Sequence, residues 1–374
     1  MIEHENIQKR PLSPGKQDIL WAFYVPICSI ICIFGILGNI ISLIVWRKLR
    51  NRFRARNVST TTYFMLLSAI DMAVLITTLF VMVLPYAEHS VFKSRSYAFF
   101  FSYIGHPIHF FLIFLSIYMV MAMSLDRVRL VYRPFSRYDI NQHKVYLMIT
   151  IFTGVAFVLN IPSFFEYRPT LNKQNTWELT ELRYLNRRAF RDAVFVTHCI
   201  GVIMVPWMTM FISNILLIFK SSNRLRNMRN ITTKDEPNAD HKQLTYTLIL
   251  VSALSLFLLA VQCVARCITM FYFVDNHNWN NIFFGREIGN LTLPINSALN
   301  FVLFCLPGKR FRKELRRLLR RYLCRHQRVL PTSSINQATD NSGPREVREV
   351  RFAQFVQSRN NPMIVLEASQ SNTT

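Results

Sequence analysis

Acidic residues are scarce in this 374-residue chain, which has 21 aspartates and glutamates against 44 lysines and arginines. The formal charge of +23 would suit a nucleic-acid-binding protein, but it accompanies a hydrophobic content of 51%. The basic residues form short clusters between apolar runs of about 20 residues or more, the length that spans a bilayer. This alternation indicates a membrane protein and excludes nucleic acid as the expected partner.

Cysteines are also scarce outside the apolar runs, where only Cys324 is found among the seven. A cysteine within an apolar run usually behaves as a small buried hydrophobic residue. None of the seven lies in a segment expected outside the cell, so we expect no extracellular disulfide, and their spacing fits no zinc site. The first 19 residues are polar and contain Pro11 and Pro14, so we expect no cleavable signal peptide.

Seven apolar runs are long enough to cross a membrane, where a helix satisfies all of its own backbone polar groups. The expected spans are 20–46, 60–84, 99–131, 145–165, 193–219, 244–274 and 288–306. The sequence therefore predicts an all-α membrane protein with a seven-transmembrane helix bundle at 20–306. The remaining parts are an extracellular amino terminus at 1–19, an amphipathic membrane-surface helix at 307–325 and a disordered cytoplasmic tail at 326–374.

Lysine and arginine in the short loops set the orientation of such a bundle. The loop after the first span holds six of them, and the loop after the second holds only Lys93 and Arg95. Later loops alternate in the same way, apart from 167–192, where acids offset several arginines. We expect a plasma-membrane protein with its amino terminus outside and its carboxyl terminus inside. Its surface helix would contact membrane lipids, and Cys324 is the candidate acylation site.

Polar side chains inside a span are costly and are therefore candidates for function. The third span ends in Asp126-Arg127, a carboxylate beside a guanidinium. This pair is either a functional element of the bundle or a marker of the cytoplasmic border.

A second polar group is expected to meet in the middle of the membrane around Asp71. Its members are Asn39, Asp71, Ser116, Asn296, Ser297 and Asn300. Ser116 lies about 16 Å before Arg127 along the helix, and Asn296 and Asn300 share one helix face. A carboxylate among hydroxyls and amides suits a sodium ion, and no other cofactor is expected. The alternative is a hydrogen-bonded cluster that only joins the helices.

Several motifs in register resemble those of the rhodopsin-like G-protein-coupled receptors. They are Gly38-Asn39, Leu67-Ser68-Ala69-Ile70-Asp71, Asp126-Arg127-Val128, Pro206 and Asn296-Ser297-Ala298-Leu299-Asn300-Phe301-Val302-Leu303-Phe304. Segments 159–166, 181–183 and 305–312 look like those of invertebrate FMRFamide-type peptide receptors and nematode serpentine receptors. The resemblance covers nearly all of 20–323 and implies a receptor without catalytic chemistry of its own.

The resemblance also implies partners and residue roles. The partners would be a short peptide ligand, a heterotrimeric G protein and arrestin. Asp126 would hold Arg127 in the inactive receptor, and Pro134 and Phe135 would begin the loop that packs on the G-protein α subunit. The group around Asp71 would form a sodium-linked core, in which Asn300 and Phe304 occupy the Asn-Pro-x-x-Tyr motif.

Four departures from the family pattern are visible. Phe301 and Phe304 replace the proline and the tyrosine of the Asn-Pro-x-x-Tyr motif. Val128 stands where the motif Asp-Arg-Tyr has tyrosine, and Ser102 stands where the family has a cysteine at the outer end of the third helix. With Phe257 as the anchor, the sixth span shows Ala260-Val261-Gln262-Cys263 in place of Cys-Trp-x-Pro.

The resemblance places the ligand at the outer mouth of the bundle. The candidate ligand-binding residues are His106, His109, Phe110, Arg266 and Glu287. Interhelical hydrogen bonding is the alternative for the two histidines, and a metal site lacks a third ligand. Three roles stay open for Arg266: snorkelling outward, pairing with Glu287, or facing an anionic ligand group.

Other classes of function remain as alternatives. A chemosensory receptor for small environmental molecules would have much the same sequence. A membrane transporter should show repeated halves, and we find no internal repeat. A seven-helix hydrolase would need zinc ligands near one membrane face, and no carboxylate accompanies the histidines at helical spacing.

Overall fold

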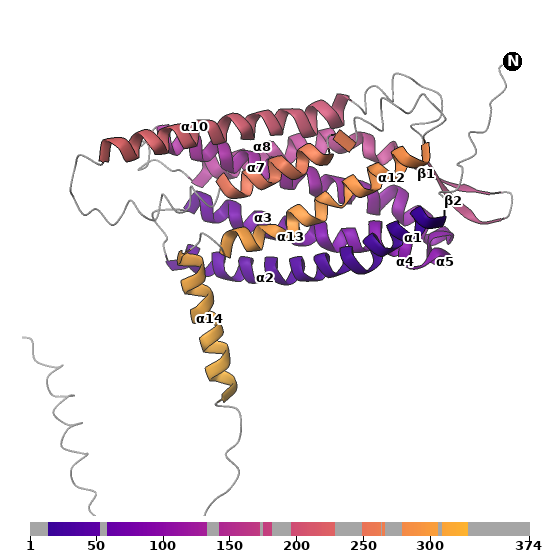
Figure 1. Cartoon of the computed structure of the whole chain (residues 1–374), viewed down its shortest axis with the longest axis horizontal. Helices are drawn as coiled ribbons and strands as arrows, with labels where there is room; N and C mark the ends of the chain where they lie inside the picture. The colour runs from indigo at the N-terminus through magenta and orange to yellow at the C-terminus, as the bar shows by residue number, and fades with distance from the viewer. Residues whose placement is uncertain are drawn as a thin grey trace, which may run out of the picture. The chain divides into compact units, whose positions relative to one another are not determined.

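The computed structural model describes residues 14–52, 58–132, 142–172, 175–181, 196–228, 249–262, 264–265, 279–305 and 309–327. Within these ranges, five helices are long and apolar enough to cross a membrane, and Ile249–Gln262 is a shorter apolar helix. The long helices lie side by side in one bundle (Figure 1). The predicted all-α membrane bundle is confirmed.

The chain order of the spans agrees with the sequence, although each span has its own irregularities. The first span consists of α1 (Pro14–Ala22), a π-helical turn (Phe23–Cys28) and α2 (Ser29–Arg52). The second consists of α3 (Val58–Thr78), a π-helical turn (Leu79–Val83) and α4 (Leu84–Ala87), and the short helix α5 (His89–Phe92) follows it. The third consists of α6 (Arg95–Phe100), a π-helical turn (Phe101–Gly105) and α7 (His106–Tyr132). The fourth span consists of α8 (Gln142–Asn160) and a 3-10 turn (Ile161–Phe165), and the fifth consists of a π-helical stretch (Val196–Met204) and α10 (Val205–Met228). The seventh consists of α12 (Trp279–Asn290) and α13 (Thr292–Cys305), and α14 (Lys309–Gln327) follows it. The first helix thus begins at Pro14, inside the segment expected as an external terminus, and the limits of the membrane span stay a prediction.

The π-helical turns have a common cause in proline. One contains Pro26, and the other three end two residues before Pro85, Pro107 and Pro206. Proline has no N–H to donate and its ring collides with the carbonyl four residues earlier, so the preceding turn widens. Pro294 has a similar effect in the seventh span, where the helix is interrupted at Leu291 between α12 and α13.

Glycine allows α2 to lie against α13. A Cβ at Gly35 would lie 2.7 Å from the Cβ of Ala298, and one at Gly38 would lie 2.8 Å from the Cβ of Phe301. Both positions therefore need a residue without a side chain for the two helices to approach this closely.

A β-hairpin follows the fourth span and was not predicted. Strand β1 (Tyr167–Leu171) pairs antiparallel with β2 (Trp177–Glu181), with Tyr167 opposite Glu181. Asn175 in the connection has a φ of 57°, a left-handed conformation that asparagine tolerates. We call the end of the bundle that carries this hairpin the hairpin end, and the other the basic end, because α2 brings Arg47, Lys48 and Arg50 there (Figure 1).

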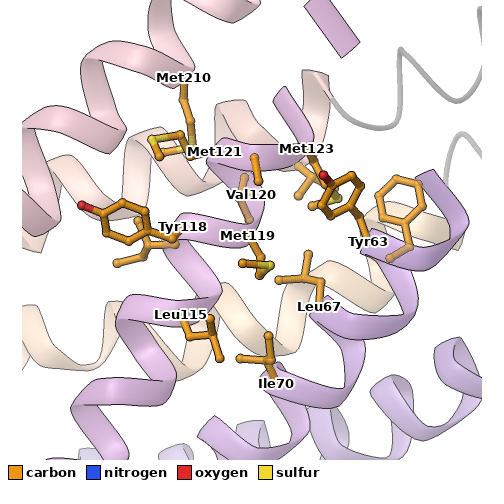
Figure 2. Packing of buried hydrophobic residues seen from close by; sticks show 14 of the residues in the cluster. Tyr63, Leu67, Ile70, Leu115, Tyr118, Met119, Val120, Met121, Met123 and Met210 are labelled. Atoms are coloured by element: carbon orange, nitrogen blue, oxygen red, sulfur yellow. The ribbon is translucent and has the colours of Figure 1, made fainter. Parts of the chain in front are cut away.

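The apolar core lies between α3, α7 and α10. Figure 2 shows Tyr63, Leu67 and Ile70 of α3 close to the α7 side chains that include Leu115 and Met119. The long α7 is the central helix, since most of its side chains are buried. A central α7 means that polar residues along it must find partners inside the protein.

The glycine contacts generate a stability prediction. Gly35→Ala should destabilise the protein by about 1–3 kcal/mol, the usual cost of overpacking. Gly154→Ala on α8 is the matched control, because a Cβ there meets no atom within 4 Å. Thermal unfolding of the detergent-purified protein would measure both. Equal melting temperatures for the two variants would contradict the proposed close approach of α2 and α13.

Candidate functional site

Asp71 of α3 is fully buried at the centre of the bundle, and three side chains hydrogen-bond to it. Its Oδ1 accepts from Ser116 Oγ of α7 at 2.8 Å and from Ser297 Oγ of α13 at 3.0 Å. Its Oδ2 accepts from Asn300 Nδ2 of α13 at 2.6 Å. Four of the polar residues expected to converge do so, and they join three helices.

Asn39 extends this group to α2. Its Nδ2 donates to the Ser297 carbonyl at 3.1 Å and to the Gly35 carbonyl at 2.9 Å. The amide oxygens of Asn39 and Asn300 are buried and accept no hydrogen bond from the residues that the structure describes. Oxygen atoms with free lone pairs beside a carboxylate are the ligands that a hard cation such as sodium requires. These residue types are therefore of the kind that such an ion needs, and the sodium-linked core stays a prediction.

A small cavity adjoins the Asp71 group. It has a volume of about 20 Å³, and its polar lining consists of Ser116, Ser255, Gln262, Thr292, Asn296 and Ser297. A space of this size holds about one water molecule. Asn296, expected in the same group, is not among the three side chains that hydrogen-bond to Asp71: its Oδ1 accepts from Ser255 Oγ of the sixth helix at 2.9 Å.

Phe304 also lies apart from Asp71. It is buried in an aromatic cluster with Trp46 and Phe64, whose ring centroids are 5.7 Å and 4.9 Å away. Phe311 of α14 joins the cluster at 5.4 Å from Trp46. Phe304 thus contributes to the packing of α2, α3, α13 and the start of α14.

Asp126 and Arg127 lie near the basic end of α7, and both are buried. The exposed fractions of their side chains are small, 6% for Asp126 and 3% for Arg127, whereas Arg129 two residues later is exposed. The structure therefore places Arg127 inside the bundle and not among lipid headgroups. Pro134 and Phe135, also expected to contact the G protein, lie outside the described residues.

The three candidates on α7 at the hairpin end pack closely together. His109 Nδ1 lies 2.9 Å from Thr77 Oγ1 of α3, and His106 Nε2 lies 3.8 Å from Glu166 Oε2. The ring of Phe110 lies 4.5 Å from that of His106 and 5.7 Å from that of His109. For His109, the interhelical hydrogen bond considered from the sequence is present.

Glu287 of α12 is fixed by two neighbours. Tyr24 Oη of the first span lies 2.9 Å from the Glu287 backbone carbonyl oxygen and 3.1 Å from Glu287 Oε2, and its one proton is shared between them. Glu287 Oε1 accepts from Arg286 Nη2 at 3.2 Å. Tyr24 also stacks on Tyr86 of α4 with ring centroids 4.5 Å apart. Arg266, the other partner considered for Glu287, lies outside the described residues.

Sequence reasoning did not identify Tyr24 or the hairpin residues as parts of this end. The alternation of apolar and polar residues from Trp177 to Glu181 is the signal for β2, because every second residue of a strand faces the same side. Leu179 is buried and Glu178 is exposed, as this alternation requires. For Tyr24 no signal exists, since its partner is 263 residues away.

The sequence of this chain is similar to known proteins over most of its length. The family model described as 7 transmembrane receptor (rhodopsin family) matches residues 38–304. A protein named FMRFamide receptor from Drosophila melanogaster is 24% identical over 318 residues, which cover 81% of this chain and 54% of that protein. The chain therefore spans about half the length of this curated relative.

The Asp71 group generates a prediction about sodium. Raising sodium chloride at constant ionic strength, with choline as the replacement cation, should increase the melting temperature of the purified protein. Asp71→Asn keeps the side-chain shape but removes the charge that a cation needs, so the sodium effect should disappear. An equal sodium effect in this variant would show that sodium acts elsewhere in the protein and would contradict a sodium site at Asp71.

Proposed function

This chain belongs to the rhodopsin family of seven-transmembrane receptors, and we propose that it binds an extracellular ligand and activates a heterotrimeric G protein. The family consists of signalling receptors and not of enzymes. The ligand would shift an equilibrium between two packings of the bundle, as any ligand does that binds one of them more tightly.

The burial of Arg127 is the observation that carries this proposal. A guanidinium inside a membrane bundle is costly and is retained where it has a function. Arg127 is 3% exposed and belongs to the matched family region. We assign to it the contact with the G protein in the active receptor, with Asp126 as its partner in the inactive one. Pro134 and Phe135 would begin the loop that packs on the same G protein.

The proposed orientation follows from charge. The basic end carries Arg47, Lys48 and Arg50 of α2, and positive charge favours the cytoplasmic side. We therefore assign the basic end to the cytoplasm and the hairpin end to the outside of the plasma membrane. Arrestin would be a second cytoplasmic partner.

The helix α14 would lie on the inner leaflet. It begins in contact with the bundle through Phe311 and carries exposed cations, among them Lys313, Arg316 and Arg320. Such a helix binds anionic headgroups with its cations while its apolar face enters the bilayer. Acylation of Cys324 would add a second anchor.

A short peptide with an amidated arginine-phenylalanine end is the ligand that we propose. The Drosophila relative is named an FMRFamide receptor, which supports a peptide over a small environmental molecule. An arginine-containing ligand needs a carboxylate, and Tyr24 and Arg286 hold that of Glu287 in one orientation at the hairpin end. The rings of His106, His109 and Phe110 are buried together at the same end, and we assign to them the contact with the phenylalanine ring. A screen of amidated neuropeptides against cells expressing this chain tests the proposal.

The first signalling prediction concerns Arg127. In membranes from cells that express the chain with a panel of G-protein α subunits, Arg127→Ala should reduce GTPγS binding to the level of receptor-free membranes. Arg129→Ala is the matched control, because that side chain is exposed on the same helix. Surface expression of both variants is measured by antibody labelling. Normal signalling by Arg127→Ala at normal expression would remove the assignment.

The second signalling prediction concerns Glu287. Losing a hydrogen bond to a charged group costs about 1.5–3 kcal/mol, so Glu287→Gln should lower peptide potency by roughly 10- to 100-fold. Glu178→Gln on the exposed face of β2 provides the control for general loss of negative charge. Dose–response curves that coincide for the two variants would exclude Glu287 as the ligand's carboxylate.

A further inference from the structure

The sixth helix of this chain lacks the residues that usually shape such a helix in the family. Neither proline nor tryptophan occurs anywhere from residue 244 to residue 274. The described part, Ile249–Gln262, is an uninterrupted helix without glycine. Whatever controls its position must therefore lie in its contacts with neighbouring helices.

Two of these contacts lead to α10. Ser252 Oγ lies 2.7 Å from Asn214 Oδ1 and 3.2 Å from the Ile249 carbonyl of its own helix, and the shorter bond is the one to Asn214. Both the Ser252 and the Asn214 side chain are buried. Trp207 Nε1, in the residue after Pro206, donates to the Leu256 carbonyl at 3.2 Å. The sixth helix has no tryptophan of its own, but Trp207 of the fifth span donates a hydrogen bond to its backbone.

Two further contacts lead to the seventh span. Ser255 Oγ donates to Asn296 Oδ1 of α13 at 2.9 Å. Gln262 Nε2 lies 3.5 Å from Asn290 Oδ1 of α12, the longest of the four contacts. Positions 252, 255 and 256 fall on one helix face at the spacing of three and four residues, and position 262 lies two turns after 255 on the same face. The opposite face is apolar and exposed, as Phe257 shows with an exposed fraction of 66%.

In the packing that these hydrogen bonds stabilise, the side chain of Arg127 is inaccessible. Its side chain is 3% exposed, so a G protein can reach it only after a helix moves away. Val251 of the sixth helix and Leu217 of α10 belong to the same buried cluster as Met123, one turn before Arg127. If the sixth helix is the element that covers Arg127, contacts that keep it in this cluster oppose the exposure of Arg127.

We propose that Asn214, Trp207 and Asn296 are positioning residues that hold the sixth helix in the inactive packing through Ser252, the Leu256 carbonyl and Ser255. The inference rests on the proposed function, because it concerns the same G-protein contact. It assigns to three side-chain hydrogen bonds the control that a proline kink and a tryptophan provide in relatives. A ligand that separates the sixth helix from α10 would have to break the Ser252–Asn214 bond.

The test begins with basal signalling. Interhelical hydrogen bonds shift an equilibrium between two packings by about threefold on average, so Ser252→Ala and Asn214→Ala should each raise ligand-independent GTPγS binding by about that factor. Thr209→Ala is the control, since among the described residues that hydroxyl bonds only within its own helix, to the Val205 carbonyl. The exchange Asn214→Ser with Ser252→Asn should restore low basal activity. A merely structural bond would lower thermal stability and surface expression without raising basal activity.

A second measurement does not need a G protein. Met123 is buried one turn before Arg127, so Met123→Cys should react slowly with a small methanethiosulfonate reagent in membranes. Adding Ser252→Ala should increase the reaction rate about threefold, and adding Thr209→Ala should not. Unchanged rates and unchanged basal activity would overturn the inference even if Arg127→Ala abolishes signalling. Faster labelling without any GTPγS response would support the inference and count against the proposed function.

Discussion

The carboxylate of Asp71 is the constraint on which the arrangement of the bundle depends. A buried carboxylate in a membrane protein is tolerated only with polar partners, and here they come from α7 and α13. The hydrogen bonds between Asp71 and these partners fix the rotation of α3, α7 and α13 about their axes. The Ser297 carbonyl then accepts from Asn39, and Gly35 allows α2 to come close enough for that bond. One charged group thereby determines the packing of four helices.

The two ends of the bundle are built differently, and proline explains the difference. Pro85, Pro107 and Pro206 follow widened turns in the halves of their spans that lie toward the hairpin end. Toward the basic end, α2, α7 and α10 run without interruption to their last cations. An irregular backbone exposes carbonyls and offers varied surfaces for a ligand, whereas continuous helices transmit displacement as rigid units. The proposed ligand site lies at the hairpin end, where the helices are irregular, and the proposed G-protein site lies at the basic end, where they are continuous.

The spans and the Asp71 group were predictable because they depend on local properties. Apolar length identifies a span, and the cost of burying polar groups predicts that they meet. Rotation about a helix axis was harder to predict: Ser297 reaches Asp71, while its neighbour Asn296, about 100° around the same helix, bonds to Ser255 instead. The contact of Tyr24 with Glu287 joins distant parts of the chain, and no periodic pattern in the sequence predicts it. The hairpin was missed because each strand has only five residues.

Ser102, where relatives have a cysteine, raises the question of what attaches the hairpin to the third span. Aromatic contacts do so: Tyr167 lies 5.3 Å from Phe101 and 4.6 Å from His106, between ring centroids. From His106 the contacts continue through Phe110 and His109 to Thr77, on the same helix as Asp71. A disulfide would fix the hairpin covalently, whereas these edge-to-face ring contacts can separate and re-form. The hairpin therefore adjoins the helices that hold Asp71 through contacts that a ligand can rearrange.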